Sequence, residues 1–403
     1  MNLARLSLAY LRAKPLNTAL NLVLLALGVA TIAFVLLATD QVEERMGRDA
    51  RGIDLVAGAK GSPMQLILSA VFHLDAPTGN IPLAAAKELA RNRAVKKAIP
   101  LALGDSYRGF RIVGTTHGYV AHYGGEPAAG RLWTEPMEAV LGAEAARATG
   151  LAVGGEFIGS HGIAEGGEEH GDRPYKVVGV LKPTGTVLDR LVLGSVESVW
   201  FVHTHPEKHD DPKAVLAALR EDEQEITALL IQYASPIAAA TLPRFVNSTG
   251  TMQAASPAFE SARLFRMIGV GVDVLRAFAL VLVAAAGLSI FIALYNAMEE
   301  RRYDLAVMRM LGASPGKLMR LVLAEAVALA LVGAAIGLVL GHLAAEVVGG
   351  MLSAEQQGAI TGRTWRAEEL WLVALAAGVG LVAGLVPAWR AYRTDISHTL
   401  AQA

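Results

Sequence analysis

Four long apolar segments constrain the fold of this 403-residue chain more than any other feature. Each is about as long as the roughly 20-residue helix that crosses the apolar core of a bilayer. The first lies near the N-terminus and contains no charged residue, and a long polar insert separates it from the other three. The segments are residues 16–39, 277–298, 318–345 and 370–389. The pattern predicts four transmembrane helices with a large domain between the first and the second.

The first apolar segment also has some features of a secretory signal peptide. However, it is longer than the roughly 7–15-residue apolar core of such a peptide, and no small-x-small cleavage site follows at Thr39 and Asp40. We therefore expect a retained membrane anchor.

Lys and Arg beside the four segments predict the orientation, because cytoplasmic loops are enriched in these residues. They gather before the first segment, between the second and third, and after the fourth, whereas the two in the 346–369 loop are offset by Glu. The cytoplasmic set is Arg5, Arg12, Lys14, Arg301, Arg302, Arg309, Lys317, Arg320, Arg390 and Arg393. Both termini are expected on the cytoplasmic side of an inner (plasma) membrane, with residues 40–276 outside.

Composition and motifs exclude several functions. The net charge of −1 gives no electrostatic support for a nucleic-acid partner. The chain has no cysteine, which excludes disulfides, thiol nucleophiles and thiolate metal sites. Residues 312–318 lack the spacing and the hydroxyl of a P-loop, and neither HExxH nor GxSxG occurs. We therefore expect a non-catalytic subunit that itself binds no cofactor.

The polar insert alternates short helical and β-rich patterns, which predicts an α+β domain. Residues 40–49 and 261–276 are expected to extend the first and second spans as helical stalks. Other expected elements are helices at 82–93, 138–150 and 213–220, strands at 53–57 and within 151–159, 174–185 and 191–202, a loop at 160–172 and a small-residue linker at 248–257.

Two regions of the chain resemble the FtsX/MacB-like permeases, the membrane subunits of type VII ABC transporters. The first is RRYDLAVMRMLGASPGKLMRLVLAEAVALALVGAAIGLVLG at residues 301–341, with PAWRAYRTDISHTL at residues 387–400. The second is AVLGAEAARATGLAVGGEF at residues 139–157 with VVGVLKPTG at residues 177–185, which is similar to the family's porter-like domain. The resemblance implies an α-helical membrane protein with four transmembrane helices and an α+β extracytoplasmic domain between helices 1 and 2.

The apolar segments and the resemblance together define the expected boundaries. They are cytoplasmic ends at 1–15 and 391–403, transmembrane helices at 16–39, 267–298, 318–346 and 370–390, an extracytoplasmic domain with stalks at 40–266, a coupling loop at 299–317 and a short outer loop at 347–369.

The resemblance implies a complex with two copies of an ABC ATP-binding subunit, which carry ATP and Mg²⁺, and with a second permease copy in a homodimer or heterodimer. Such a complex converts ATP hydrolysis into motion of the outer domain (mechanotransmission), for export or extraction of lipid-linked, peptide or small-molecule cargo. Membrane lipids and a periplasmic partner are the other expected contacts. One alternative is a transmembrane regulator of an extracytoplasmic hydrolase or sensor, and another is a component of a zinc-related ABC system.

In the family, the loop between the second and third spans holds the coupling helix, which docks in the ATPase. Here the loop is basic and has apolar residues at helical spacing. Relatives commonly have Glu where this chain has Asp304, which shortens the reach of the carboxylate. The expected ATPase-coupling residues are Tyr303, Asp304, Val307, Met308, Leu311, Gly312 and Ser314.

The third span carries two unusual features. Gly333, Gly337 and Gly341 form a stripe that lets another helix approach closely, either within the subunit or across a dimer interface. Glu325 lies near the cytoplasmic end of the span, and an ionisable residue in a membrane helix is a candidate functional residue. The alternative is a structural ion pair with Arg320 or Arg309.

Histidines gather in the outer segment. His203 and His205 would share a face in an extended strand, and His209 follows closely. Imidazole suits Zn²⁺ and Cu²⁺, so these three residues are candidate metal ligands. The spacing matches no fixed metal motif, and a solvated polar loop is the alternative.

Overall fold

The computed structural model describes residues 15–162, 173–204, 211–354 and 360–393. Contacts within the chain divide it into two compact units. The first contains residues 1–42, 268–354 and 358–403, and the second contains residues 43–267 and 355–357.

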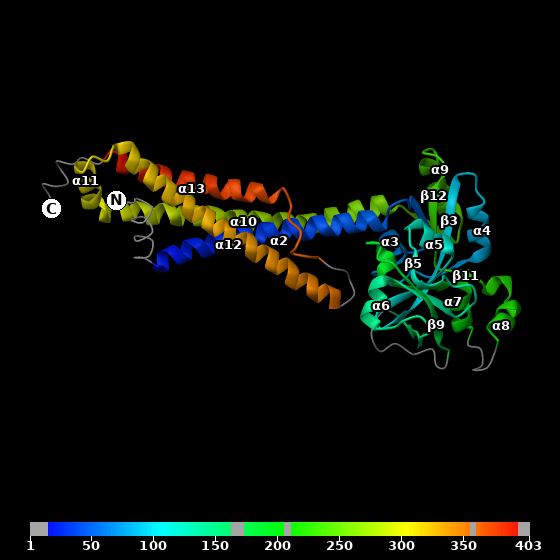
Figure 1. Cartoon of the computed structure of the whole chain (residues 1–403). Coiled ribbons are helices and arrows are strands. Elements are labelled where there is room, and N and C mark those ends of the chain that lie inside the picture. Colours follow the sequence, from blue (N-terminus) through cyan, green and yellow to red (C-terminus); the bar gives the residue numbers. More distant parts are fainter. Residues whose placement is uncertain (1–14, 163–172, 205–210, 355–359, 394–403) are drawn as a thin grey trace. The chain divides into compact units, whose positions relative to one another are not determined.

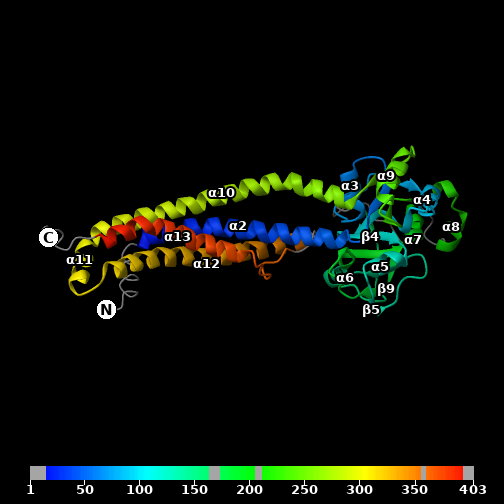
Figure 2. The ribbon, with the colours of Figure 1, turned by 90° about the horizontal axis from the view of Figure 1, so that it is seen from above.

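Long helices that run alongside one another make up the first unit (Figures 1 and 2). The helices are α2 (Pro15–Asp49), α10 (Pro257–Glu300), α11 (Arg302–Met310), α12 (Pro315–Ala354) and α13 (Glu369–Tyr392). All except the short α11 are long and apolar enough to cross a membrane. The α2 helix continues without a break through residues 40–49, and α10 includes residues 261–276.

Residues from all four long helices meet in the core of this unit. Many of them are alanine, whose small side chain lets the helix backbones approach closely and make dispersion contacts. The buried set includes Leu25, Val29, Ala33, Val283, Ala286, Ile290, Ala326, Ala330, Ala334, Leu372 and Ala376.

An 11-stranded sheet forms the centre of the second unit, in the order β13-β1-β12-β3-β4-β10-β6-β9-β5. The β7 strand pairs with β9 and β8 pairs with β3, while β2 and β11 form a separate pair. Neighbours are antiparallel except β4 with β10 and β6 with β9. The strands are β1 (Leu55–Ala59), β2 (Ile81–Pro82), β3 (Val95–Tyr107), β4 (Phe110–Thr115), β5 (Pro127–Gly130), β6 (Glu138–Leu141), β7 (Glu156–Phe157), β8 (Ser160–His161), β9 (Tyr175–Leu181), β10 (Leu191–Ser195), β11 (Glu225–Ile226), β12 (Ala228–Tyr233) and β13 (Met252–Ala255).

Short helices connect and cover these strands. Every residue of β4 is buried, so both faces of the sheet are covered at its centre. The helices are α3 (Pro63–Ala70), α4 (Leu83–Ala90), α5 (His117–His122), α6 (Ala143–Thr149), α7 (Val196–His203), α8 (Pro212–Ala218) and α9 (Ala238–Ser248), with 3₁₀ turns at Val187–Arg190 and Glu221–Glu223.

Several local expectations were wrong because strand pairing or a helix cap overrides the local pattern, and the expected loop at 160–172 begins with the β8 strand. The expected helix at 138–150 begins as β6, and only the part after Gly142 is helical. The expected strand at 191–202 becomes α7 after Ser195, whose side chain caps the helix by accepting from Ser198 N. The expected linker at 248–257 contains β13, which pairs with β1.

Candidate functional site

The α11 helix has two different faces. Leu305, Ala306 and Met308 are buried. Leu305 and Met308 pack with residues at the adjoining ends of α10, α12 and α13, including Met298, Leu318, Val322 and Ala388. On the other face Tyr303, Met310 and Leu311 are 54%, 61% and 78% exposed. The inner face therefore anchors α11, and the outer face presents large apolar side chains.

The expected coupling residues divide between these two faces. Tyr303, Asp304, Leu311, Gly312 and Ser314 are exposed and Val307 is half-buried. Met308 is only 6% exposed, so its side chain supports α11 and does not lie on the surface. Exposed Met310 was missed by sequence reasoning.

Gly312 has a structural role at the end of α11. Its φ of +97° lies in the left-handed region that favours glycine. Gly312 N donates to Arg309 O at 3.0 Å, and Ala313 N donates to Met308 O at 3.0 Å. These two bonds form a Schellman motif, which ends the helix and turns the chain towards α12.

Glu325 is buried and forms an ion pair with Arg301, between Oε2 and Nη1 at 3.1 Å. Arg301 immediately precedes α11, so the pair joins that helix to α12. Of the two expectations for Glu325, the structure shows the ion pair, but its partner is Arg301 and not Arg320 or Arg309. Nearby, Arg390 Nη1 lies 3.1 Å from Glu299 Oε1, which joins α13 to the end of α10.

The glycine stripe of α12 faces α2 of the same chain. A Cβ at Gly333 would lie 3.0 Å from Leu25, one at Gly337 would lie 2.7 Å from Ala26 O, and one at Gly341 would lie 2.9 Å from Ala33. The stripe is therefore used for close packing within the subunit.

A polar network lies at the other end of α12. Gln41 Nε2 donates to Thr361 O at 2.8 Å, and Thr361 N donates to Gln41 Oε1 at 2.9 Å. His342 Nε2 lies 2.8 Å from Glu369 Oε2. Glu346 Oε2 accepts from Gly362 N at 3.0 Å. These contacts bond the loop after α12 to α2 and α12, and His342 joins α12 to α13.

In the second unit, the end of α2 is bonded to the sheet domain. Asp49 is buried and its Oδ2 lies 3.4 Å from Arg190 Nη2. Tyr123 Oη donates to Asp49 O at 2.6 Å, and His122 Nε2 donates to Arg51 O at 2.9 Å. These bonds fix the last turn of the helix.

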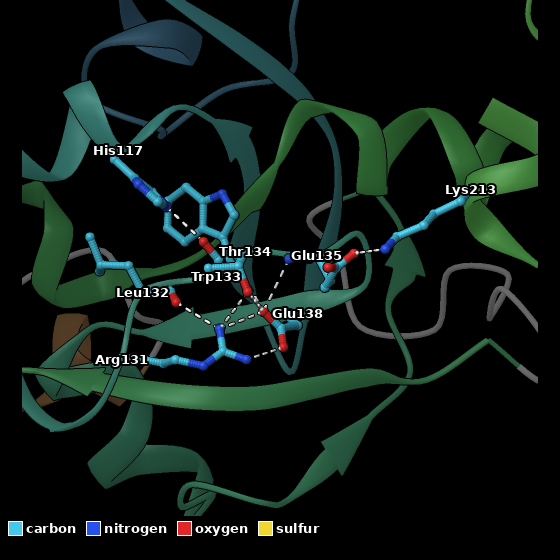
Figure 3. A network of polar contacts seen from close by, with 8 residues as sticks. All are labelled: His117, Arg131, Leu132, Trp133, Thr134, Glu135, Glu138 and Lys213. Atoms are coloured by element: carbon cyan, nitrogen blue, oxygen red, sulfur yellow. Dashed lines mark hydrogen bonds and ion pairs between the residues drawn. The ribbon is translucent and has the colours of Figure 1, made fainter. Parts of the chain in front are cut away.

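The loop between β5 and β6 is ordered by Glu138 (Figure 3). Its carboxylate accepts from Arg131 Nη1 at 2.7 Å and from Thr134 N at 2.7 Å. The hydrogen bonds from Arg131 lower the pKa of Glu138 to about 2. Lys213 Nζ on α8 lies 2.6 Å from Glu135 Oε2, and this ion pair attaches the loop to α8.

Of the three expected metal-ligating histidines, the structure places His203, whereas His205 and His209 lie outside the described residues. His203 is the last residue of α7, so it does not lie in an extended strand. Its described neighbours are His161 and Asp105. Sequence spacing does not bring these two residues to His203, because the pairing of β8 with β3 places His161 beside Asp105.

Comparisons with protein families decide the class of this chain. The model of the MacB-like periplasmic core domain matches residues 18–242, more than half of the chain, and the model of the FtsX-like permease C-terminal matches residues 276–396. The chain belongs to the FtsX/MacB-type ABC transporter permeases. The permease is a multi-pass membrane protein with a periplasmic or extracellular α+β domain between its first two membrane helices. Membership of an ABC permease family implies an ATPase partner.

Two solved structures show similarity to the permease. One is the periplasmic region of MacB from Actinobacillus actinomycetemcomitans, which is 12% identical with a TM-score of 0.35. The match covers 56% of this chain and 97% of the MacB chain. The extracellular domain of the noncanonic ABC-type transporter YknZ from Gram-positive bacteria shares 14% identity, covers 50% of this chain and 99% of its own, and has a TM-score of 0.29. No curated protein matches the chain.

Proposed function

We propose that the permease receives ATP-driven motion from a partner ATPase at α11 and passes it to the outer domain. The observation that carries this proposal is the division of α11 into an anchored face and an apolar exposed face. Monomeric surfaces rarely leave large apolar side chains gathered at one helix end unless a partner covers them. The basic residues of the loop favour a cytoplasmic position for this surface.

The contacts around α11 support transmission of force. Arg301 joins it to α12 through Glu325, and Leu305 and Met308 pack among the adjoining helix ends. A displacement of α11 would therefore move α10 and α12 as well. The α10 and α2 helices continue unbroken beyond their apolar parts, which suits them to carry axial displacement.

In this proposal ATP and Mg²⁺ bind to the ATPase, two copies of which serve a pair of permease chains, and this chain is not an enzyme. Both termini lie in the cytoplasm, and the motion drives export or extraction of a lipid-linked, peptide or small-molecule cargo. The proposed contacts of α11 with the ATPase are Tyr303, Asp304, Val307, Met310 and Leu311.

The test uses the full permease in nanodiscs with the ABC ATPase that co-purifies with it from its native membrane. Leu311→Glu places a charge on the exposed face, so we expect loss of ATPase co-purification and of permease-stimulated ATP hydrolysis. Ile237→Glu is the matched control, because Ile237 is 74% exposed in the outer domain. If Leu311→Glu stimulates ATP hydrolysis as strongly as the wild type does, α11 is not the docking surface.

A further inference from the structure

We propose that Asp105, His161 and His203 form a Zn²⁺-binding site on the outer domain of the permease. The three residues come from different elements: β3, β8 and the end of α7. One ligand atom from each lies within 4.8 Å of the other two. This inference does not depend on the proposed function of α11.

The fold holds the three side chains together by its backbone. Asp105 and His161 are directly paired residues of the antiparallel β3 and β8 strands. Gly162 N donates to Gly104 O at 2.9 Å, which extends this pairing beyond the last residue of β8. The α7 helix starts at a Ser195 cap and buries Val199 and Val202, which directs its last residue to the same place. The site is therefore largely preformed.

The distances among the three groups fit a shared cation. His161 Nδ1 and His203 Nε2 lie 3.3 Å and 3.4 Å from the same oxygen, Asp105 Oδ1. Charge-assisted hydrogen bonds are shorter, at about 2.7–2.9 Å. Ligand atoms held about 2.0–2.1 Å from a tetrahedral Zn²⁺ lie roughly 3.3–3.4 Å apart, so both distances match edges of such a tetrahedron.

Hydrogen bonding sets the tautomer of His203. Its Nδ1 lies 2.8 Å from Val199 O, and a carbonyl can only accept, so Nδ1 carries the proton. In the neutral ring the lone pair is then on Nε2, which faces Asp105. Metal-ligating histidines are commonly oriented by such a bond from the other ring nitrogen. Gly104 leaves space beside Nε2, since a Cβ there would lie 3.5 Å from it.

Burial of Asp105 makes a positive charge favourable here. Its side chain is 1% exposed, and a buried carboxylate is costly unless a cation or hydrogen bonds compensate it. The His161 side chain is 58% exposed, which leaves a path for an ion from solvent.

Two imidazoles and one carboxylate are a ligand set that suits Zn²⁺. With three described protein ligands, the fourth tetrahedral position is open to water or to a bound molecule, as in sites that exchange ligands rather than closed structural ones. A bound ion would fasten β8 and the end of α7 to β3.

The test is a Zn²⁺ titration by calorimetry of the full permease in nanodiscs, purified without a polyhistidine tag. We expect the wild type to bind Zn²⁺ and His161→Gln or His203→Gln to weaken binding on the order of 100-fold, because loss of a ligand costs at least as much as loss of a second-shell partner. His122→Gln is the matched control, since His122 also bonds a backbone carbonyl but lies outside this group. It should bind like the wild type.

Two further readouts separate loss of the site from loss of the fold. His161 lies on an exposed edge, so His161→Gln should keep the unfolding temperature of the zinc-free wild type while losing the Zn²⁺-induced increase. Co²⁺ bound to the wild type should give the strong visible absorption of tetrahedral coordination, and this should disappear in His161→Gln. Undiminished Zn²⁺ affinity in both histidine variants, or no binding by the wild type, would overturn the proposal.

Discussion

The α7 and α11 helices are both short, yet they use their surfaces in opposite ways. The α7 helix buries Val196, Val199, Phe201 and Val202 in the outer domain, and its Ser195 cap and terminal His203 are both hydrogen bonded. The α11 helix buries Leu305 and Met308 but leaves Leu311, just beyond its last turn, 78% exposed. The chain itself therefore completes the packing of α7, whereas α11 is only half covered.

This difference separates a positioning element from a docking element. Burial of four apolar side chains makes α7 suitable for holding one side chain at a fixed place, which is what a metal site needs. Exposure of large apolar side chains makes α11 suitable for contact with another protein, since a few anchor side chains contribute most of the binding free energy of such interfaces. Substitutions should therefore act on stability at α7 and on partner binding at α11.

The largest expected effect is on α7. Phe201 is 5% exposed, and Phe201→Ala should lower the free energy of unfolding of the outer domain by about 3–5 kcal/mol, because it leaves a cavity. Denaturant unfolding of the full permease, followed by tryptophan fluorescence, would measure this. Met310→Ala, on the exposed face of α11, is the control and should change stability little; equal losses in the two variants would remove the distinction between the helices.

A somewhat smaller effect is expected at the anchor of α11. Arg301→Gln leaves buried Glu325 without its ion-pair partner, which should destabilise the membrane unit by about 3 kcal/mol. Thermal unfolding in nanodiscs is the measurement. The double variant Arg301→Gln with Glu325→Gln should recover much of the loss, because no buried charge then remains unpaired. No recovery would mean that Arg301 acts through contacts other than this pair.

The membrane helices and the fold class could be predicted from the sequence because both depend on patterns that are continuous in the chain. The side-chain partners could not be predicted in this way. For Glu325 an ion pair with Arg320 or Arg309 was one of two expectations, but packing of α12 against the end of α10 brings Arg301 to it. Met308 was expected at the ATPase contact, although its spacing from Leu305 also fits the buried face that the structure shows.

The proposed metal site illustrates the same limit more sharply. His203 was selected from a local cluster of histidines, and neither Asp105 nor His161 lies near it in the sequence. Strand pairing sets the position of His161, and the docking of α7 sets that of His203. The turn from β10 into α7 at Ser195 was itself missed, so the geometry could not be derived.

A moderate, pH-dependent effect is expected at the loop that supports α7. Met137 N donates to Ser198 Oγ at 2.8 Å, and neighbouring Glu138 orders the loop. Glu138→Gln should cost about 1–2 kcal/mol at neutral pH, the usual range for a hydrogen-bonded charge beside a half-exposed Arg. Unfolding at several pH values would measure it.

The sign of the pH dependence follows from the lowered pKa of Glu138, which falls from 4.5 to about 2. The contribution of Glu138 is present above pH 4.5 and is lost as the pH falls towards 2, because the carboxylate then becomes protonated in the folded state as well. The wild type and Glu138→Gln should therefore converge in stability at acidic pH. A difference that stays constant down to pH 2 would assign the effect to the amide itself and not to the charge.

The smallest effect on stability is expected at the exposed end of α11. Leu311→Ala should change the free energy of unfolding by less than about 0.5 kcal/mol, because the side chain is 78% exposed. If Leu311 is an anchor of the ATPase interface, the same change should weaken binding of the ATPase about fivefold or more, which corresponds to the 1 kcal/mol that marks an important interface residue. Titration of nanodisc-embedded permease with the ATPase would show this, with Ile237→Ala as the control. A variant that is as stable as the wild type and binds the ATPase equally well would leave the exposed face of α11 without a role in docking, and the contrast with α7 would then concern packing alone.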